Sequence, residues 1–484
     1  MIVSAFALGI TLAGAGCARQ VIATTCKYQT KEVAFGAVSE YALPNSSRDP
    51  NGITTGAAGS VWFGNQALGG VDNLFPNGTL VEYSWPGYPG DGRLNATYPK
   101  ALIWNVQVWD GRVWAADNGG TLVNGLDPGN DSVVELNVTA AQHPATSAPA
   151  LAPYILTATP YGDMWFTALP FLTGGELPVV GRISSNLSVT LYAVSGLGHE
   201  EPIQIQFYNS TVAYLVALDP SDPTDSGLYS FDPLTSNATI YATRVGGNFS
   251  MIYPDSLTIV GDTVWITQHA TSAVVSYDLR TGVWTTYPTS NVDFTYATYP
   301  YFIQSYGGAV WFNEHYANEI AMVNASAGTM TEYSEADPPI VNSDYIQQDL
   351  TVAAGPQGLW FTSWDGNYIG LVSGSQSPSF SISASDGNQT SLPPGTSATV
   401  NLTLSGKWSD SLTVLSSDSE DFNSTPTQIA ILPNQTVFAP GSGPRSLSVV
   451  IDVEDTLPQG RYTVDITVSD GLVRQTAFLV VDVR

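Results

Sequence analysis

Charged side chains are scarce in this chain of 484 residues. Asp, Glu, Lys and Arg make up 12% of it, about half the usual share. The acidic residues number 42 and the basic residues 15, which gives a net charge of −27. Proteins that bind nucleic acid need a basic surface for the phosphates, and the sequence contains no basic stripe. The composition therefore excludes nucleic acid as a partner.

Cysteine is also scarce, with only Cys17 and Cys26 in the chain. A structural zinc site takes four ligands, so two cysteines do not make one. A disulfide between them is expected in an extracellular setting, provided that the intervening chain is not one continuous helix. In a helix, two positions nine residues apart lie too far from each other to be bridged.

The first sixteen residues, MIVSAFALGITLAGAG, carry no charge. They lack the basic start of a signal peptide, and GAGC lacks the aliphatic residue of a lipoprotein leader. As a helix they would span about 24 Å, short of a hydrocarbon core of ~30 Å. We expect residues 1–32 to be an apolar N-terminal segment with a short helix. It would serve as a signal, as a membrane contact or anchor through residues 1–16, or as an assembly helix.

A repeat with a period near fifty residues organises most of the chain. Its template is Gly307–Glu335, which reads as a Gly-Gly turn, a strand around Trp311, a polar loop and two further strands. The aromatic-centred strand recurs at Trp62, Trp114, Trp165, Tyr214, Trp265, Trp311 and Trp360. Several short strands in each repeat are typical of β-propeller blades, which bury their faces against their neighbours. The seven repeats predict seven blades.

The seventh repeat lacks a closing strand. Other repeats end in segments such as VEYSWP (81–86) and TEYSE (331–335), whereas residues 358–375 continue into a Ser-rich stretch. The missing pattern occurs at the other end of the propeller, as VSEYALPN at 38–45. We therefore predict that Val38–Leu43 pairs with Ile369–Val372. This pairing would close a propeller over residues 33–373 and remove an exposed sheet edge.

Beyond a linker at 374–378, residues 379–484 alternate apolar and polar side chains with a period of two. Examples are SLSVVIDV (446–453) and YTVDITV (462–468), with turns such as Pro393-Pro394-Gly395. This pattern predicts an antiparallel immunoglobulin-like β-sandwich. The overall fold class is therefore all-β.

Asn-x-Ser/Thr sequons are more frequent than expected. Fourteen of the 25 asparagines lie in one, where chance would give about five. They are Asn45, Asn77, Asn95, Asn130, Asn137, Asn186, Asn209, Asn237, Asn248, Asn324, Asn388, Asn401, Asn423 and Asn434. The excess predicts an extracellular surface carrying N-glycans. The alternative is that Asn and Ser/Thr merely share turns.

Polar residues are predicted to gather at one rim of the propeller channel. Loops after the aromatic strands and loops between blades supply Asp117, Gln268, His269, Glu314, His315, Asn318, Trp364 and Asp365, and His143, His199, Glu200 and Tyr301, respectively. The alternative is that they only make turn hydrogen bonds. Elsewhere, Asp219, Asp222 and Asp225 offer oxygen ligands for Ca²⁺ or form a solvated acidic loop, because their spacing is not that of an EF-hand.

The pattern Gly-x-x-Trp-Phe, polar loop, Ile, turn and Glu-Tyr resembles the seven-bladed streptogramin (virginiamycin B) lyase-like propellers over about residues 33–373. The resemblance implies histidines and glutamates at the rim that act with Mg²⁺ to open a lactone ester by removing a proton beside its carbonyl. It makes Glu314 the candidate ligand of Mg²⁺ and His269 or His315 the candidate base. No blade-entry Pro-x-x-Ile segment, such as 50–53, carries a histidine, so these residues do not align with the family's catalytic motif.

Two functional classes follow. The sequons and the appended sandwich favour a structural, binding or adhesive protein of the cell surface, whose partners are copies of itself or other surface components. A low-charge, sequon-rich composition suits an acidic medium and an archaeal host. An apolar helix followed by a sandwich resembles archaeal type IV pilins, which predicts a filament with bundled N-terminal helices. The family resemblance favours the alternative, an Mg²⁺-dependent carbon–oxygen lyase.

Overall fold

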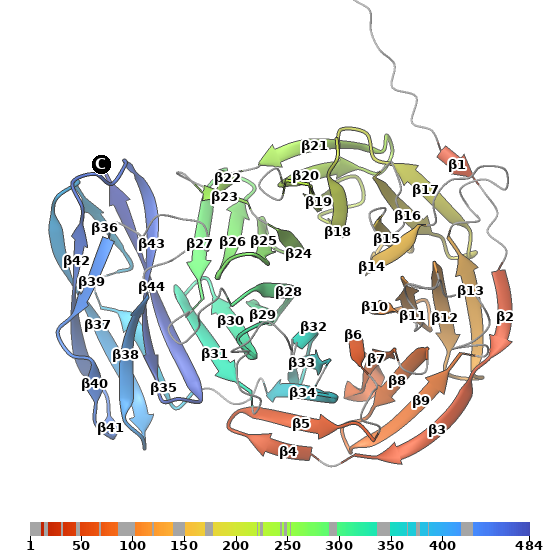
Figure 1. The fold of residues 1–484 in the computed structure, drawn as a ribbon, viewed down its shortest axis with the longest axis horizontal. Helices are drawn as coiled ribbons and strands as arrows, with labels where there is room; N and C mark the ends of the chain where they lie inside the picture. The colour runs from red at the N-terminus through yellow and green to blue at the C-terminus, as the bar shows by residue number, and fades with distance from the viewer. Residues whose placement is uncertain are drawn as a thin grey trace, which may run out of the picture. The chain divides into compact units, whose positions relative to one another are not determined.

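The computed structural model is built almost entirely of β-strands, in agreement with the all-β prediction (Figure 1). It describes residues 11–13, 18–30, 32–44, 49–66, 69–85, 102–118, 121–138, 151–169, 178–219, 221–222, 226–242, 244–245, 249–251, 253–289, 298–335, 349–364, 366–373, 378–385, 387–417 and 429–484. The chain forms two compact units, Met1–Thr30 with Pro44–Thr243 and Lys31–Leu43 with Arg244–Arg484.

The first unit contains four antiparallel meanders of four strands, in the orders β6–β9, β10–β13, β14–β17 and β18–β21. Three of them gain a fifth strand from the N-terminal segment, because β3 pairs with β9, β2 with β13 and β1 with β17. The elements are β1 (Thr11–Ala13), β2 (Ala18–Ile22), β3 (Thr24–Gln29), β6 (Pro50–Thr55), η1 (Ala57–Gly59), β7 (Val61–Asn65), β8 (Gly70–Leu74), β9 (Thr79–Ser84), β10 (Ile103–Trp109), β11 (Arg112–Asp117), β12 (Leu122–Asp127), β13 (Ser132–Asn137), β14 (Ala152–Ala158), β15 (Met164–Leu169), β16 (Val179–Ile183), β17 (Val189–Ala193), β18 (Glu201–Phe207), β19 (Ala213–Leu218), β20 (Gly227–Asp232) and β21 (Asn237–Ala242).

The second unit contains two meanders, β24–β27 and β28–β31, a sheet ordered β32-β33-β34-β5-β4, and the C-terminal strands. Its strands are β4 (Glu32–Phe35), β5 (Val38–Ala42), β22 (Arg244–Val245), β23 (Phe249–Ser250), β24 (Pro254–Val260), β25 (Thr263–Gln268), β26 (Ala273–Asp278), β27 (Trp284–Pro288), β28 (Pro300–Tyr306), β29 (Ala309–Glu314), β30 (Glu319–Asn324), β31 (Thr329–Ser334), β32 (Asp349–Gly355), β33 (Gly358–Ser363), β34 (Tyr368–Ser373), β35 (Phe380–Ala384), β36 (Gln389–Leu392), β37 (Ser397–Trp408), β38 (Leu412–Ser417), β39 (Ile429–Pro433), β40 (Val437–Phe438), β41 (Gly441–Ser442), β42 (Arg445–Val453), β43 (Gly460–Ser469) and β44 (Val473–Val483).

The repeat predicted from the sequence is present in both units. Each predicted aromatic residue lies on the second strand of its meander, from Trp62 on β7 to Trp360 on β33. All seven aromatic side chains are buried. Six of them contact a tyrosine of the closing strand, as Trp62 does Tyr83 and Trp265 does Tyr287, whereas Trp114 contacts Trp109 of β10. The period of the sequence therefore follows from one aromatic anchor in each sheet.

The predicted pairing of Val38–Leu43 with Ile369–Val372 is confirmed. Strand β5 runs antiparallel to β34, with Tyr41 opposite Ile369 and Val38 opposite Val372. The Tyr41 ring packs on Trp360, whose centroid is 5.7 Å away. A strand from the start of the chain thus supplies the closing strand that the seventh repeat lacks.

The C-terminal strands form two sheets around one buried cluster that includes Leu402, Leu447 and Ile466. They are not separated from the repeat, because β44 pairs with β31 as well as with β43. The β28–β31 meander therefore continues through β44 into the C-terminal sheet, and Figure 1 shows β44 beside β31. The sequence did not predict this shared sheet.

The N-terminal helix is not seen among the described residues. Thr11–Ala13, Ala18–Ile22 and Thr24–Gln29 are strands on the outer edges of three sheets, while residues 1–10 and 14–17 lie outside the described part. Glycines at 9, 14 and 16 each disfavour a helix by about 1 kcal/mol relative to alanine. An outer strand offers unpaired backbone groups to an extended segment. The helix prediction is therefore wrong for residues 11–13.

Glycine is required where an aromatic ring crosses a neighbouring strand. Gly181 lies opposite Phe166, and Gly370 lies opposite Phe361. A Cβ atom added at Gly181 would lie 2.0 Å from the Phe166 ring, and one at Gly370 would lie 1.9 Å from the Phe361 ring. Both rings are fully buried, so they have little room to move.

We predict that Gly370→Ala lowers the free energy of unfolding by about 1–3 kcal/mol, because the added methyl overpacks the sheet. Chemical denaturation of the full chain measures the loss. Phe361→Leu serves as the control, alone and combined with Gly370→Ala. The double variant should be more stable than the sum of the two single effects, because leucine leaves room for the methyl. Strictly additive effects would contradict the proposed clash.

Candidate functional site

Two groups of polar side chains lie in the second unit near the ends of β25 and β29. The carboxylate cluster is Glu314, Glu319 and Glu332. The His–Tyr cluster is His269, Tyr299, Tyr301, His315 and Tyr316. His269 and His315 directly follow two equivalent aromatic strands, β25 and β29, which end at Gln268 and Glu314.

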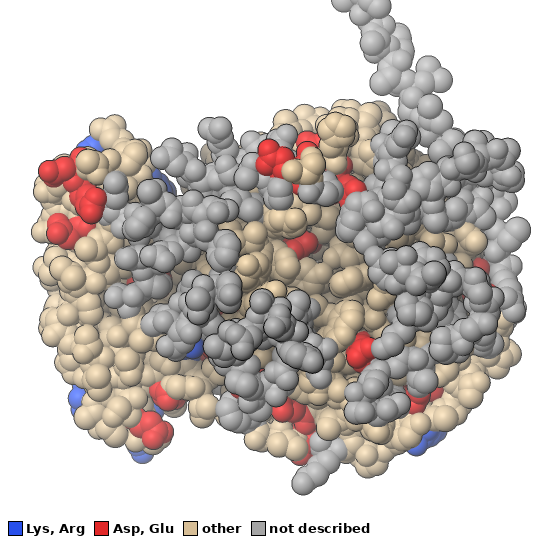
Figure 2. All heavy atoms as spheres, in the orientation of Figure 1, with Lys and Arg blue, Asp and Glu red and all other residues tan. Residues whose placement is uncertain are grey.

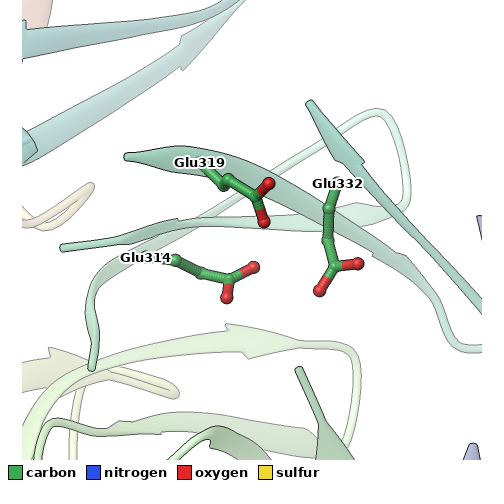
Figure 3. A group of neighbouring side chains, drawn as sticks. All are labelled: Glu314, Glu319 and Glu332. Atoms are coloured by element: carbon green, nitrogen blue, oxygen red, sulfur yellow. The ribbon is translucent and has the colours of Figure 1, made fainter. Parts of the chain in front are cut away.

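The carboxylate cluster is assembled by one meander. Glu314 ends β29 and pairs in register with Glu319, which begins β30, while Glu332 lies on β31. One oxygen from each side chain lies within 4.8 Å of the others, and the three side chains point toward one another (Figure 3). Their residues are only 0–2% exposed. Three acids in such a space repel one another unless protons or cations compensate them.

Part of that compensation comes from the C-terminal strand β44. Arg474 donates from Nη1 to Oε2 of Glu319 at 2.5 Å, and the Ser334 hydroxyl donates to Oε1 at 2.9 Å. Among the described residues, neither carboxylate oxygen of Glu314 has a hydrogen-bond partner. Burial, followed by the charges of Glu332 and Glu319, raises the pKa of Glu314 well above its ordinary value. Arg474 and the nearby Thr298 hydroxyl oppose this shift only partly.

The His–Tyr cluster is centred on two imidazole rings. The rings of His269 and His315 are 5.2 Å apart, and Tyr301 lies 4.7 Å from His269 and 5.1 Å from His315. Nδ1 of His269 lies 3.2 Å from Oδ2 of Asp255 on β24. Its side chain keeps 26% of its surface exposed, but its Nε2 atom is buried and has no hydrogen-bond partner among the described residues.

Burial determines the protonation states of Asp255 and His269. It raises the pKa of Asp255 to about 8 and lowers the pKa of His269 to about 4. Near neutral pH the carboxyl group therefore holds the proton and the imidazole is neutral, so the pair carries no net charge. A neutral imidazole can accept a proton, which is the state that a general base requires.

The three predicted catalytic residues are divided between the two clusters. His269 and His315 come together, as predicted, but Glu314 has the carboxylates and Arg474 as its charged neighbours. The split arises because successive residues near the end of a strand point to opposite sides. A catalytic role for these residues stays a prediction.

Other residues predicted for the rim are distributed over both units. Gln268, Tyr301 and Asn318 are buried close to the two clusters, and Trp364 lies in the turn after β33. Asp117, His199 and Glu200 belong to the first unit, where Glu200 accepts a hydrogen bond from the Tyr229 hydroxyl. His143 and Asp365 lie outside the described residues.

The acidic loop at 218–227 has a local explanation. Oδ1 of Asp219 accepts hydrogen bonds from the amide and hydroxyl of Ser221 and from the amide of Asp222. These bonds, the Ser221 hydroxyl first, lower the pKa of Asp219. Asp225 lies outside the described residues. The geometry of Asp219 is that of a turn, and calcium binding there stays untested.

Ten of the fourteen sequon asparagines are described, and none of those ten is buried. Asn45, Asn95, Asn248 and Asn423 lie outside the described part. At Asn77, Asn130 and Asn209, the side-chain oxygen accepts a backbone N–H two residues later, as expected of a turn. This hydrogen bond involves only the side-chain oxygen. The amide nitrogen, to which a glycan attaches, takes no part in it. Turn formation and glycosylation are thus compatible.

Two further N-terminal predictions remain open. Cys26 is exposed on β3, but Cys17 lies outside the described residues, so the disulfide stays a prediction. Among the described residues, no helix has the length and apolar character needed to cross a bilayer.

Sequence reasoning missed Glu319, Glu332, Asp255 and Arg474. Glu332 had a signal, since the Glu-Tyr ending of its strand recurs at Glu82. The other three had none, because the strands equivalent to β24 and β30 do not repeat the acidic residue and β44 lies outside the repeat. Arg474 lies 155 residues from its partner Glu319, and only the shared sheet brings them together.

No family model and no curated protein matches this chain. Among solved structures it is similar to a virginiamycin B lyase from Staphylococcus aureus, with 18% identity over 69% of this chain and 98% of that chain and a TM-score of 0.49. It is also similar to the extracellular domain of a hybrid two-component system from B. thetaiotaomicron, with 10% identity over 95% of this chain and 60% of that chain and a TM-score of 0.43.

We predict that Glu314→Gln makes the protein less sensitive to alkali. Because the pKa of Glu314 is raised in the fold, the folded state binds more protons than the unfolded state above pH 4.5, and stability falls as the pH rises. Glutamine should leave stability near pH 4 almost unchanged and raise it at pH 8 by about 1–3 kcal/mol, the penalty of an unsatisfied buried group. Denaturation at both pH values measures this, with the exposed Glu454→Gln as control. A parallel pH dependence of wild type and Glu314→Gln would contradict the prediction.

Proposed function

We propose that this chain is an extracellular, N-glycosylated protein of the cell surface with a structural or binding role. Its scaffold would be a closed seven-bladed β-propeller joined to an immunoglobulin-like sandwich. The observation that carries this proposal is that none of the ten described sequon asparagines is buried. Within the scaffold, Arg474 of β44 pairs with Glu319 of the carboxylate cluster in the shared sheet. This ion pair joins the C-terminal strand β44 to the carboxylate cluster of the last complete meander, β28–β31.

The burial of these acids supports a scaffold role over catalysis. A carboxylate that binds a substrate-bound metal must be reachable, whereas Glu314 and Glu332 are 0% exposed. The exposed surface is also suited to glycans and to low-charge contacts, because most of the described face in Figure 2 carries neither acidic nor basic side chains. The partners would be copies of this chain in a filament or surface array, or other cell-surface components.

The test is to purify the protein from the surface of its native cells. We expect its mass to exceed that of the 51.4 kDa polypeptide because of glycans, and removal of the glycans should restore the polypeptide mass. Peptide mapping should place the glycans on sequon asparagines such as Asn324, and electron microscopy should show the protein in an assembly. Recovery of an unmodified protein from the cell interior would contradict this proposal.

The second candidate is the Mg²⁺-dependent carbon–oxygen lyase, and the His–Tyr cluster specifically favours it. His269 combines a neutral ring with a carboxyl partner at Nδ1 in Asp255, and its buried Nε2, which would take the proton, has no hydrogen-bond partner among the described residues. In this proposal Glu314 would hold the Mg²⁺, since its two oxygens have no hydrogen-bond partner among the described residues. The cation would supply Lewis-acid polarisation of the ester carbonyl.

Two measurements test the lyase proposal. Millimolar Mg²⁺ should raise the melting temperature of the wild type but not that of Glu314→Gln. Opening of a streptogramin lactone should fall by a factor of about 10²–10⁴ in His269→Ala, the usual contribution of a general base. If wild type neither responds to Mg²⁺ nor opens the lactone, the lyase proposal is wrong, while the surface proposal is unaffected.

A further inference from the structure

Outer sheet edges in the first unit are paired by consecutive pieces of the N-terminal segment. Going backward along that segment, β3 pairs with β9, β2 with β13 and β1 with β17. Each step toward the N-terminus moves to the closing strand of the next meander in the sequence. The meander after β14–β17 is β18–β21, and its closing strand is β21.

Strand β21 has no fifth strand beside it among the described residues. At its start, Ser195 forms a short parallel bridge, in which the Ala238 amide donates to the Ser195 carbonyl and the Ser195 amide donates to Ser236. Because backbone groups alternate along a strand, the amide of Ile240 points to the same outer edge as that of Ala238. The second half of β21, Thr239–Ala242, extends beyond the bridge.

Side-chain exposure distinguishes β21 from a covered closing strand. Leu191 on β17 and Ile240 on β21 hold equivalent positions, since Leu191 pairs with Gly181 opposite Phe166 and Ile240 pairs with Tyr229 opposite Leu215. Leu191, with Leu12 of β1 opposite it in register, is 1% exposed. Ile240 is 52% exposed. Both strands therefore carry an apolar residue at this position, but only Leu191 of β17 is buried, whereas Ile240 of β21 is exposed.

We propose that the segment before β1, within residues 1–6 of the same chain, pairs with Thr239–Ala242 as the fifth strand of this sheet. Four residues separate β1 from β2, so a connection of similar length, residues 7–10, would reach from β1 to the next closing strand. Extended, four residues reach about 13–14 Å. Residues 1–6, MIVSAF, are uncharged and include the β-branched Ile2 and Val3, which suit an apolar sheet edge.

An open edge of this kind is also a site for association between molecules. An exposed strand that carries Ile240 and Tyr241 is a template for any extended apolar segment, including that of another copy. The same chain is the occupant that the observations favour, because its preceding strands already follow the neighbouring edges in order. The inference is independent of whether the protein is a surface component or a lyase.

Hydrogen exchange of the full chain tests the pairing. We compare it with a chain lacking residues 2–8, which keeps β1 intact. The outward-facing amide of Ile240 should exchange at least tenfold faster in the shortened chain, because it loses its acceptor, whereas the Ala238 amide keeps its bond to Ser195. Amides in 189–193, covered by β1, should exchange at equal rates in both chains and serve as the internal control. Equal rates at Ile240 in the two chains would overturn the proposal.

A disulfide identifies the occupant. In a chain with Cys17→Ser and Cys26→Ser, Thr239→Cys is combined in turn with Val3→Cys, Ser4→Cys or Ala5→Cys. A neighbouring strand places one of these positions within the 3.5–4.5 Å between Cβ atoms that a disulfide requires. A cross-link within one chain supports the proposal. A cross-linked dimer assigns the edge to a second copy and overturns the same-chain assignment, as does a mature protein that begins after Gly16.

Discussion

An unpaired sheet edge is the constraint on which much of this structure depends. A four-stranded meander leaves the backbone N–H and C=O groups of its outer strand without partners, and such an edge invites aggregation. In this chain, segments from the two ends pair with the outer strands of four meanders, while β21 and β27 have no fifth strand among the described residues. The N-terminal strands pair with β9, β13 and β17, and β44 pairs with β31. Segments that look like appendages in the sequence are thus integral parts of the sheets.

Edge pairing and charge compensation coincide at β31. Arg474 lies opposite Glu332 in the β31–β44 register and reaches across to Glu319, so the strand that covers the edge also brings the cation. Removing the arginine alone would leave buried acids uncompensated, which is far more destabilising than never having placed them there. The Arg474–Glu319 pair therefore favours one position of β44 beside β31, because a shifted register would leave both buried charges without a partner.

Structural features that recur in the repeats were predicted from the sequence, whereas features that occur only once were missed. The aromatic strands follow from their period, and VSEYALP was found because it matches a pattern that recurs in the other repeats. Residues 11–29 carry no such pattern, and an apolar, alanine-rich start resembles a helix until the sheet edges are known. In the candidate site, local order placed His269 and His315 correctly on one side. It could not separate them from Glu314, because the direction of a side chain at a strand end depends on the turn that follows.

The buried acids and the low-charge composition of the protein have the same consequence for its stability as the pH changes. Raised pKa values at Glu314 and Asp255 mean that the folded state holds protons that the unfolded chain releases, so each favours folding as the pH falls. His269 opposes them only between about pH 4 and 6.5, where the unfolded imidazole binds a proton more readily than the folded one. A surface with few ion pairs loses little when its carboxylates become protonated. The scarcity of charge outside and the protonated acids inside therefore favour the same condition, a fold that keeps its stability in acid.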